Sequence, residues 1–275
     1  MVDRVAVVTG GAGGIGRGLA AAAAARGMSV MLADVDETRL DETRSALASD
    51  GSRVAVRTLD VTDRSSMAAL ADSTLAEFGR VDMIFLNAGL APVQTPFARI
   101  ADADWDRIMR VNVDGVRNGI LCFLPLLEEA GEGHINATAS VNGHLAEQGI
   151  GAYNVSKFAV VAMMETLHVD LAREGSPVSA SCLCPGPIAT DLLKRAVGVD
   201  QGTTDEEHRL LNRGMDPEEV GRITFEAIDE GRFWVFTHPV MVDKTIRARF
   251  DAMADRGQRP IDLDWPWSDI LREEL

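Results

Sequence analysis

A tyrosine and a lysine four residues apart, Tyr153 and Lys157, are the reactive side chains whose spacing first suggests chemistry. Tyr153 is the only tyrosine in 275 residues, and it lies in the segment A-Y-N-V-S-K-F. On a helix, residues at this spacing lie on the same face, one turn apart. A phenol has a pKa of about 10, and a neighbouring ammonium group favours the phenolate. The pair could exchange a proton near neutral pH, although a buried tyrosine covered by a lysine has the same spacing.

A second candidate site is the glycine-rich stretch T-G-G-A-G-G-I-G, residues 9–16, which joins an apolar run to an alanine-rich run. Between a strand and a helix, Gly10 would permit a tight turn, and Gly14 and Gly16 would permit close approach of a phosphate and of the strand. The helix N-terminus would then favour the negative charge of a pyrophosphate. An ordinary glycine turn is the alternative interpretation.

An acidic residue, Asp34, ends the second expected strand, eighteen residues beyond Gly16. A carboxylate at this place would bind the ribose hydroxyls of a dinucleotide and repel a 2′-phosphate. The glycine loop has no basic residue before Gly16, and Arg17 follows it on the expected helix. We therefore expect NAD as the cofactor in preference to NADP. A simple strand-end cap is the alternative for Asp34.

The elements that must position these residues alternate along the chain as short β-branched runs and longer helical stretches. Apolar strands that alternate with helices indicate a parallel sheet covered on both faces. We predict an α/β fold: a single-domain Rossmann fold with a doubly wound parallel sheet of about seven strands. The expected strands are Val5–Thr9, Ser29–Ala33, Arg53–Leu59, Val81–Asn87, His134–Ala139, Val178–Cys184 and Arg232–Thr237. The expected helices are 15–26, 37–49, 65–78, 104–130 with a kink at Pro125, 151–173, and one opened by Asp216 and Pro217.

Composition narrows the classes of partner. The net charge of −15 argues against nucleic acid and anionic membrane surfaces. The sequence shows no secretory signal, and no apolar run approaches the roughly 18 residues that span a bilayer.

The three cysteines, Cys122, Cys182 and Cys184, lack metal-ligand spacing and fit reduced thiols. Cys182 and Cys184 are expected on one face of a strand. We expect a cytoplasmic protein with no metal site.

With these motifs in this order, residues 3–190 resemble the short-chain dehydrogenase/reductase family, NAD(P)-dependent enzymes with a Rossmann fold. The resemblance implies a set of cofactor-binding residues in the glycine loop, at the ends of strands and near the nicotinamide. They are Gly10, Gly14, Ile15, Gly16, Asp34, Asp60, Val61, Asn87, Ala88, Gly89, Tyr153, Lys157, Pro185, Gly186, Ile188 and Thr190.

The resemblance also implies that Asn112, Ser140, Tyr153 and Lys157 are catalytic, with Tyr153 as the general acid/base. Hydride transfer from an alcohol carbon needs the hydroxyl proton removed in concert, which a base near working pH does best. Tyr153 would supply the phenolate, Lys157 and the nicotinamide charge would lower its pKa, and Ser140 would hydrogen-bond the substrate oxygen. By resemblance, Asn112 would hold a water that links Lys157 to solvent. A strand-end cap for Ser140 and a helix-kink residue for Asn112 are the alternatives.

The substrate pocket is expected to include Ser140, His144, Leu145, Gln148 and Leu192. Residues 1–190 would form the dinucleotide-binding and catalytic core, 191–215 a lid, and 216–275 a C-terminal helix, strand and tail. Because the pocket is partly apolar, the predicted substrate is a mid-sized, largely apolar secondary alcohol or ketone. His168 and His238 have no evident catalytic partner, and we expect them to be structural or interface residues. By resemblance, a homodimer or homotetramer is expected through 104–130 and 151–173.

Three other functions are alternatives, and the third is not expected from a chain of this length. One is an NADP-dependent carbonyl reductase with the same residues. Another is a non-catalytic dinucleotide sensor, which would have no need of Ser140, Tyr153 and Lys157 together. The third is an epimerase or dehydratase on an extended Rossmann fold, which needs a larger C-terminal domain.

Overall fold

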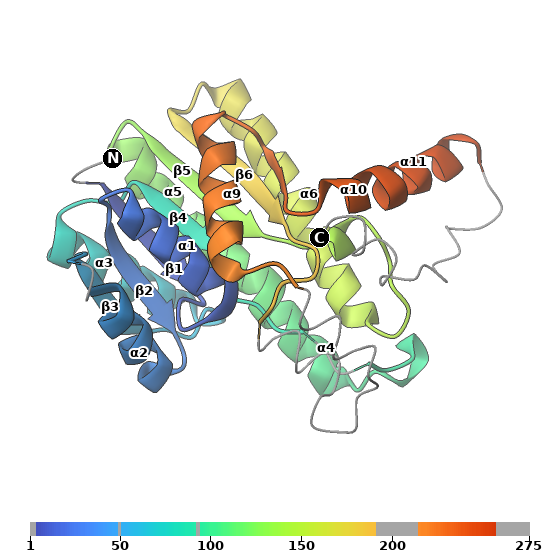
Figure 1. Cartoon of the computed structure of the whole chain (residues 1–275), viewed down its shortest axis with the longest axis horizontal. Coiled ribbons are helices and arrows are strands. Elements are labelled where there is room, and N and C mark those ends of the chain that lie inside the picture. The colour runs from blue at the N-terminus through green and yellow to red at the C-terminus, as the bar shows by residue number, and fades with distance from the viewer. Residues whose placement is uncertain (1–3, 49–50, 92–93, 191–213, 257–275) are drawn as a thin grey trace.

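The structure is a computed structural model, and it describes residues 4–48, 51–91, 94–190 and 214–256 (Figure 1). Seven parallel strands form one sheet in the order β3-β2-β1-β4-β5-β6-β7. The strands are β1 (Val5–Thr9), β2 (Ser29–Asp34), β3 (Val54–Thr58), β4 (Met83–Leu86), β5 (Gly133–Thr138), β6 (Val178–Cys184) and β7 (Trp234–Phe236). The strand order reverses between β1 and β4, where open α/β sheets form a ligand crevice. The predicted α/β fold with a parallel Rossmann sheet is confirmed.

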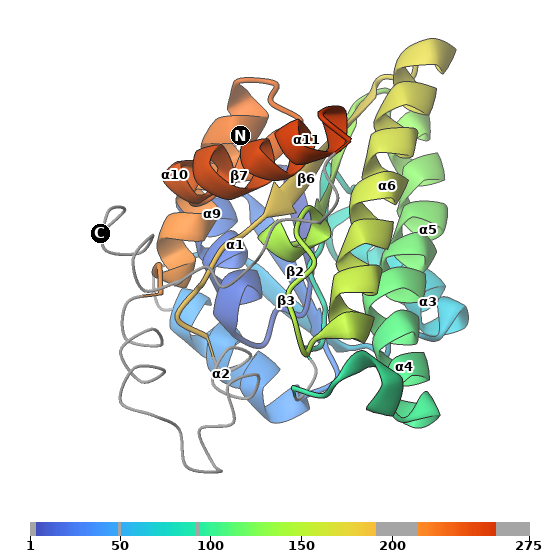
Figure 2. The ribbon, with the colours of Figure 1, turned by 90° about the vertical axis from the view of Figure 1, so that its right-hand side faces the viewer.

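Helices cover both faces of the sheet (Figure 2). One face carries α1 (Gly14–Ala25), α2 (Glu37–Ala48) and α9 (Pro217–Asp229), and the other carries α3 (Arg64–Phe78), α5 (Gly115–Glu129) and α6 (Gly151–Glu174). In β1, Ala6 and Val8 belong to the core of the first face and Val7 to the core of the second. Both faces of the strand are therefore apolar, which explains why the strands read as continuous apolar runs.

Helices α1 and α9 cross in close contact because each places a glycine at the crossing. A Cβ on Gly18 would lie 1.8 Å from the carbonyl oxygen of Pro217, and one on Gly221 would lie 2.2 Å from that of Gly18. Ala20 and Ala23 of α1 are fully buried beside them. The alanine-rich run is thus a packed helix, as predicted.

The region from 104 to 130 is not the single helix that we expected. It consists of α4 (Asp102–Met109), a π-helical turn (Arg110–Asp114) and α5, which continues through Pro125. The side chain of Asn112 leaves the helix: its Oδ1 accepts from Leu90 N at 2.7 Å, and its Nδ2 donates to Leu90 O at 3.0 Å. This pairing with another segment places the departure from α geometry at Asn112 and not at Pro125.

The chain beyond β7 is helical up to Ala254. It forms α10 (Pro239–Met241), a π-helical turn (Val242–Ile246) and α11 (Arg247–Ala254), which run toward α6 (Figure 2). The predicted lid lies outside the described residues except for Gly214 and Met215, and so does the tail after residue 256. None of the described helices is long and apolar enough to cross a membrane.

A buried carboxylate ties the start of β1 to the loop before β4. Asp82 is 2% exposed, and its Oδ2 accepts from Val5 N at 2.8 Å and from Arg80 Nε at 2.9 Å. We expect Asp82→Ala to lower the free energy of unfolding by about 1–3 kcal/mol, because the buried Val5 N–H loses its only side-chain acceptor. Glu132→Ala is the control, since this half-exposed carboxylate also pairs with Arg80 but should cost at most about 1 kcal/mol. Denaturant unfolding measures both, and equal costs would contradict the assignment.

Candidate active site

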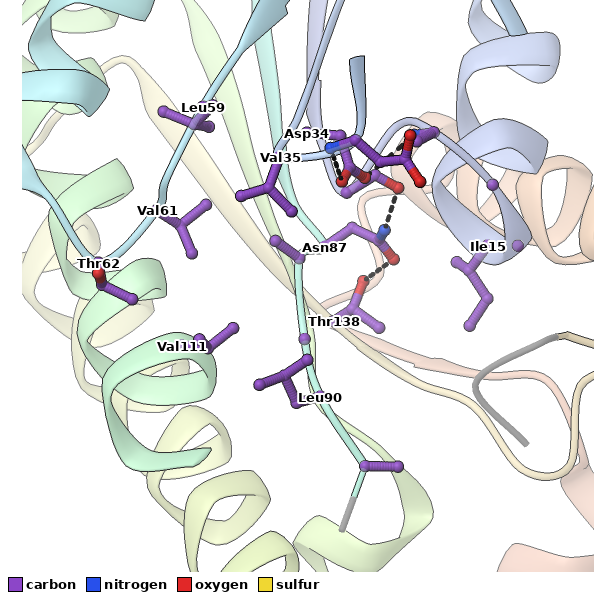
Figure 3. A pocket seen from close by; sticks show the side chains of 18 of the residues that line it. Ile15, Asp34, Val35, Leu59, Val61, Thr62, Asn87, Leu90, Val111 and Thr138 are labelled. Atoms are coloured by element: carbon purple, nitrogen blue, oxygen red, sulfur yellow. Dashed lines mark hydrogen bonds between the residues drawn. The ribbon is translucent and has the colours of Figure 1, made fainter. Parts of the chain in front are cut away.

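A cavity of about 810 Å³ opens where the carboxyl ends of the first six strands meet. Asp34, Asn87 and Thr138 follow one another along it (Figure 3). Its lining includes most of the predicted cofactor-binding residues: Gly10, Gly14, Ile15, Asp34, Asp60, Val61, Asn87, Ala88, Gly89, Tyr153, Lys157, Pro185 and Thr190. Gly16, Gly186 and Ile188 do not line it. One cavity thus reaches from the glycine loop to the Tyr153–Lys157 pair.

The glycine loop is packed tightly enough to exclude side chains. Gly10 has φ +67°, and a Cβ on it would lie 2.9 Å from the Cα of Ala88. A Cβ on Gly16 would lie 2.0 Å from the carbonyl oxygen of Gly10, so Gly16 serves packing behind the cavity wall. Gly13, the N-cap of α1, has no side chain that could cap the helix, and Gly14 and Ile15 line the cavity. Uncapped N–H groups and the helix dipole suit a pyrophosphate, so the loop fits a dinucleotide.

Asp34 is fixed beside this loop. Its Oδ2 accepts from Ala12 N and its Oδ1 from Asp36 N, both at 3.2 Å. The sequence reasoning missed a cation here, because it considered only the loop itself and Arg17. Arg39 lines the cavity from α2, and its Nη2 would lie 2.6 Å from a Cβ on Gly13. Its place in the first turn of α2, shortly after Asp34, was the available signal.

Asn87 links three strands at the middle of the cavity (Figure 3). Its backbone N donates to Thr9 Oγ1 at 3.0 Å, and its Nδ2 donates to Thr9 O at 3.2 Å. Thr138 Oγ1 donates to Asn87 Oδ1 at 3.1 Å. Thr9, the first residue of the glycine-rich stretch, and Thr138, which the sequence did not point to, thus hold Asn87 in place between β1 and β5.

Tyr153 and Lys157 lie one turn apart on α6, and both line the cavity. Lys157 Nζ lies 5.6 Å from the centre of the Tyr153 ring and donates to Thr138 O at 2.8 Å. Burial lowers the pKa of Lys157 to about 8 and raises the pKa of Tyr153 to about 12. The neutral phenol is therefore the resting form, and the expected phenolate needs more positive charge than Lys157 supplies.

Ser140 and Asn112 stand behind this pair and do not line the cavity. Ser140 is 5% exposed, and its hydroxyl forms a hydrogen bond with Tyr153 that favours the phenolate when Ser140 donates. Asn112 Nδ2 also donates to Ser156 Oγ at 3.0 Å. A Cβ on Gly89 would lie 3.4 Å from Asn112 Oδ1 and 3.5 Å from Lys157 Nζ, which places both beside the same backbone segment. The structure brings the four predicted catalytic residues together.

None of the described members of the predicted substrate pocket lines the cavity. His144 and Leu145 are buried and do not line the cavity. A 3-10 turn at Val141–Gly143 directs the chain toward β7, so that the His144 ring packs 5.1 Å from that of Trp234. Gln148 is exposed, and Leu192 lies outside the described residues.

Two of the other histidines, His168 and His238, do not line the cavity. His168 packs on Phe233, with ring centroids 4.8 Å apart. His238 is 2% exposed, and its Nδ1 lies 2.7 Å from Thr237 Oγ1, which accepts from Gly186 N at 3.1 Å. Burial lowers the pKa of His238 to about 4. It therefore supports the segment at Gly186 as a neutral side chain.

The thiols are placed as predicted. Cys182 and Cys184 are fully buried, with Sγ atoms 3.8 Å apart on one face of β6. Cys122 is also free. Within the described part of the chain, no group of three histidine, cysteine or carboxylate side chains could hold a metal ion.

Comparison with known proteins places this site in a family. Residues 4–198 match the family model described as short chain dehydrogenase. The chain is 33% identical over 240 residues to 3beta-hydroxysteroid dehydrogenase 2 of Eggerthella lenta, which covers 85% of this chain and 91% of that protein. It is also 33% identical over 248 residues to 1-deoxy-11-beta-hydroxypentalenate dehydrogenase of Streptomyces exfoliatus, covering 90% and 86%.

A solved structure agrees in both fold and length. The crystal structure of a short chain dehydrogenase/reductase from Burkholderia phymatum in complex with NAD has a TM-score of 0.86 and 35% sequence identity. The match covers 94% of this chain and 96% of that chain. This protein therefore belongs to the short-chain dehydrogenase/reductase family of NAD(P)-dependent oxidoreductases.

Proposed function

We propose that this protein transfers a hydride between NAD(H) and a mid-sized, largely apolar secondary alcohol or ketone, with Tyr153 as general acid/base. The observation that carries the proposal is that one cavity is lined by Asp34 beside the glycine loop and by Tyr153 and Lys157. The two relatives described above support it, because both are named as dehydrogenases of hydroxylated compounds.

The chain's own residues divide the remaining work. When bound, NAD supplies the hydride acceptor and a positive nicotinamide ring. Tyr153 moves the hydroxyl proton. Ser140, whose hydroxyl must turn toward the cavity to do so, holds the substrate oxygen. Lys157, anchored on Thr138 O, adds positive charge beside the phenol. Asp34 binds the ribose hydroxyls, and the N-terminus of α1 receives the pyrophosphate.

Apolar lining supports the substrate class. Leu90, Ala91 and Val111 line the cavity on the side where Asn112 anchors the chain. We expect cyclic or aryl secondary alcohols to be oxidised with higher kcat/KM than small polyols. A panel of alcohols assayed with NAD measures this, and faster turnover of the polyols would exclude the proposed class.

Asp34 is expected to set the cofactor preference. Wild-type protein should bind NADH more tightly than NADPH, and Asp34→Ala should reduce that ratio by at least about tenfold, because a charged hydrogen bond contributes roughly 1.5–3 kcal/mol. Fluorescence titration of each nucleotide measures the ratio. Arg17→Gln is the control, since Arg17 is exposed on α1 and does not line the cavity. An unchanged ratio in Asp34→Ala would remove Asp34 from the ribose site.

A second candidate, an NADP-dependent carbonyl reductase, is favoured by one observation. The Arg39 guanidinium lies beside Gly13 at the same end of the cavity as Asp34, where a 2′-phosphate would meet it. If this candidate holds, Arg39→Gln will weaken NADPH binding far more than NADH binding. Under the leading proposal, both affinities change by less than about threefold, since Asp34 already excludes the phosphate.

A homodimer or homotetramer is also proposed. Leu121 on α5 and Val155 and Val169 on α6 are exposed apolar side chains on the two helical regions expected at the interface. Light scattering of the purified protein tests this, and a monomer would contradict it.

A further inference from the structure

A chain of hydrogen bonds leads from the catalytic site to a carboxylate that the mechanism above does not use. Ser140 Oγ lies 3.3 Å from Asn142 Oδ1, and Asn142 Nδ2 donates to Glu147 Oε2 at 3.1 Å. Glu147 is itself held in place, because its backbone O accepts from Asn154 Nδ2 at 2.7 Å. Ser140 and Asn142 are both buried, so water does not replace these partners.

The carboxylate of Glu147, at the end of this hydrogen-bond network, determines which atom donates in each of its hydrogen bonds. An ionised carboxylate only accepts, so Asn142 presents its NH₂ group to Glu147 and its carbonyl oxygen to Ser140. The amide oxygen also only accepts, so the Ser140 hydroxyl proton points at Asn142. The other acceptor in reach, Pro185 O, is more distant at 3.5 Å.

Ser140 is then left as an acceptor for Tyr153. Its oxygen takes one hydrogen bond from Asn142 N at 3.1 Å and has one lone pair free for the phenol. A neutral phenol donates into that lone pair, whereas a phenolate has no proton to give. Ionisation of Tyr153 therefore requires the Ser140 hydroxyl to turn away from Asn142.

We propose that Glu147 and Asn142 are positioning residues that hold the Ser140 hydroxyl toward Asn142 and so keep Tyr153 a neutral phenol in the coenzyme-free protein. A neutral phenol is the form that protonates a carbonyl oxygen, so the network biases the resting site toward reduction. The bias toward reduction rests on the proposed function. The effect of the network on the ionisation of Tyr153 does not depend on that function.

Other charged residues lie near Tyr153 and surround the network. Lys157 faces it from α6, and Glu147 from the loop before α6. From α4 and the π-helical turn, Asp106, Arg107 and Arg110 line the same cavity. Burial is the largest cause of the raised pKa of Tyr153; the hydrogen bond with Ser140 lowers that pKa, and the negative charge of Glu147 raises it. Burial lowers the pKa of Lys157, and Cys182 and Cys184 on β6 raise it by a smaller amount.

The test uses the fact that Tyr153 is the only tyrosine in the sequence, so that it alone produces a phenolate absorbance signal. The coenzyme-free protein is mixed rapidly into alkaline buffers, and the phenolate is recorded before unfolding, with circular dichroism at the same delay. We expect Glu147→Gln to lower the midpoint by about half a pH unit, which gives roughly threefold more phenolate at a fixed pH below it. Tyr153→Phe supplies the zero of the signal.

Two further variants make the result specific. Asn142→Ala frees the Ser140 hydroxyl directly and should shift the midpoint in the same direction. Asp106→Asn removes one charge from the cavity wall without touching Asn142, and should leave the midpoint within about 0.3 pH unit of wild type.

A midpoint within about 0.3 pH unit of wild type for either Glu147→Gln or Asn142→Ala overturns the proposal. So does an equal shift in Asp106→Asn, which would show a general charge effect. Because no substrate or coenzyme is present, these outcomes are independent of whether the proposed reaction is correct. A merely structural role of Glu147 would change stability and leave the midpoint where it is.

Discussion

Tyr153→Phe is expected to lower kcat for alcohol oxidation by about 10²- to 10⁴-fold, the range that a positioned proton-transfer group contributes. The substitution removes one hydroxyl and keeps the ring on α6, so the cavity wall beside Lys157 is preserved. Without the phenol, the hydroxyl proton has no acceptor when the hydride leaves. Steady-state rates at saturating NAD and alcohol measure the loss.

Coenzyme binding separates this loss from misfolding. Tyr153→Phe should bind NADH within about threefold of wild type, because the adenosine and pyrophosphate contacts are elsewhere. Phe158→Leu is a matched control: Phe158 is on the same helix and packs against Arg249, but it does not line the cavity. Its kcat should be close to that of wild type. If Tyr153→Phe binds NADH and keeps more than a tenth of the activity, another group is the base.

Gly18→Ala is expected to lower the free energy of unfolding by about 2 kcal/mol. Helix propensity alone predicts the opposite sign, since alanine is about 1 kcal/mol more favourable than glycine inside a helix. The added Cβ, however, would lie 1.8 Å from the carbonyl oxygen of Pro217, which is backbone and cannot rotate away. Overpacking costs about 1–3 kcal/mol and occasionally more, so the clash between α1 and α9 outweighs the propensity. Denaturant unfolding measures the change.

Gly231→Ala is the control for this prediction. Gly231 has φ +68°, and nothing lies within 4 Å of its Cβ position, so alanine there meets backbone strain without a clash. We expect it to cost about 1–2 kcal/mol. Because α1 carries the glycine loop, Gly18→Ala should also weaken NADH binding, whereas Gly231→Ala should not. A Gly18→Ala protein as stable as wild type would show that the two helices separate easily.

The strands were predictable because most of them are buried on both faces. β1 and β6 have the predicted bounds, and Gly10 and Pro185 end them with clear breaks. Helix α9 was equally clear, since Asp216 accepts from Glu218 N at 2.8 Å as its cap. In these segments a local signal and the tertiary environment favour the same structure.

The substrate side was less predictable. The sequence does not show whether a side chain that follows a strand points into the cavity or packs against a neighbouring strand. His144 packs against Trp234 of β7. Asn112 was named above as an alternative helix-kink residue, but the π-helical turn itself could not be predicted. The partner of Asn112 is the backbone of Leu90, in another part of the chain. The role of Arg39 was missed because its guanidinium, on α2, comes beside Gly13 of the glycine loop only in the folded chain.

The family, the parallel sheet and the main candidate residues could be predicted from the sequence; those residues are the glycine loop, Asp34, Ser140, Tyr153 and Lys157. These follow from residue types at short spacings, and from apolar runs that only a doubly covered sheet can bury. The form that Tyr153 takes at rest depends instead on the folded arrangement. Burial, Lys157 held on Thr138 O, and the Glu147–Asn142–Ser140 chain come from separate segments. A pKa depends on what surrounds a group in space, which the order of residues along the chain does not reveal.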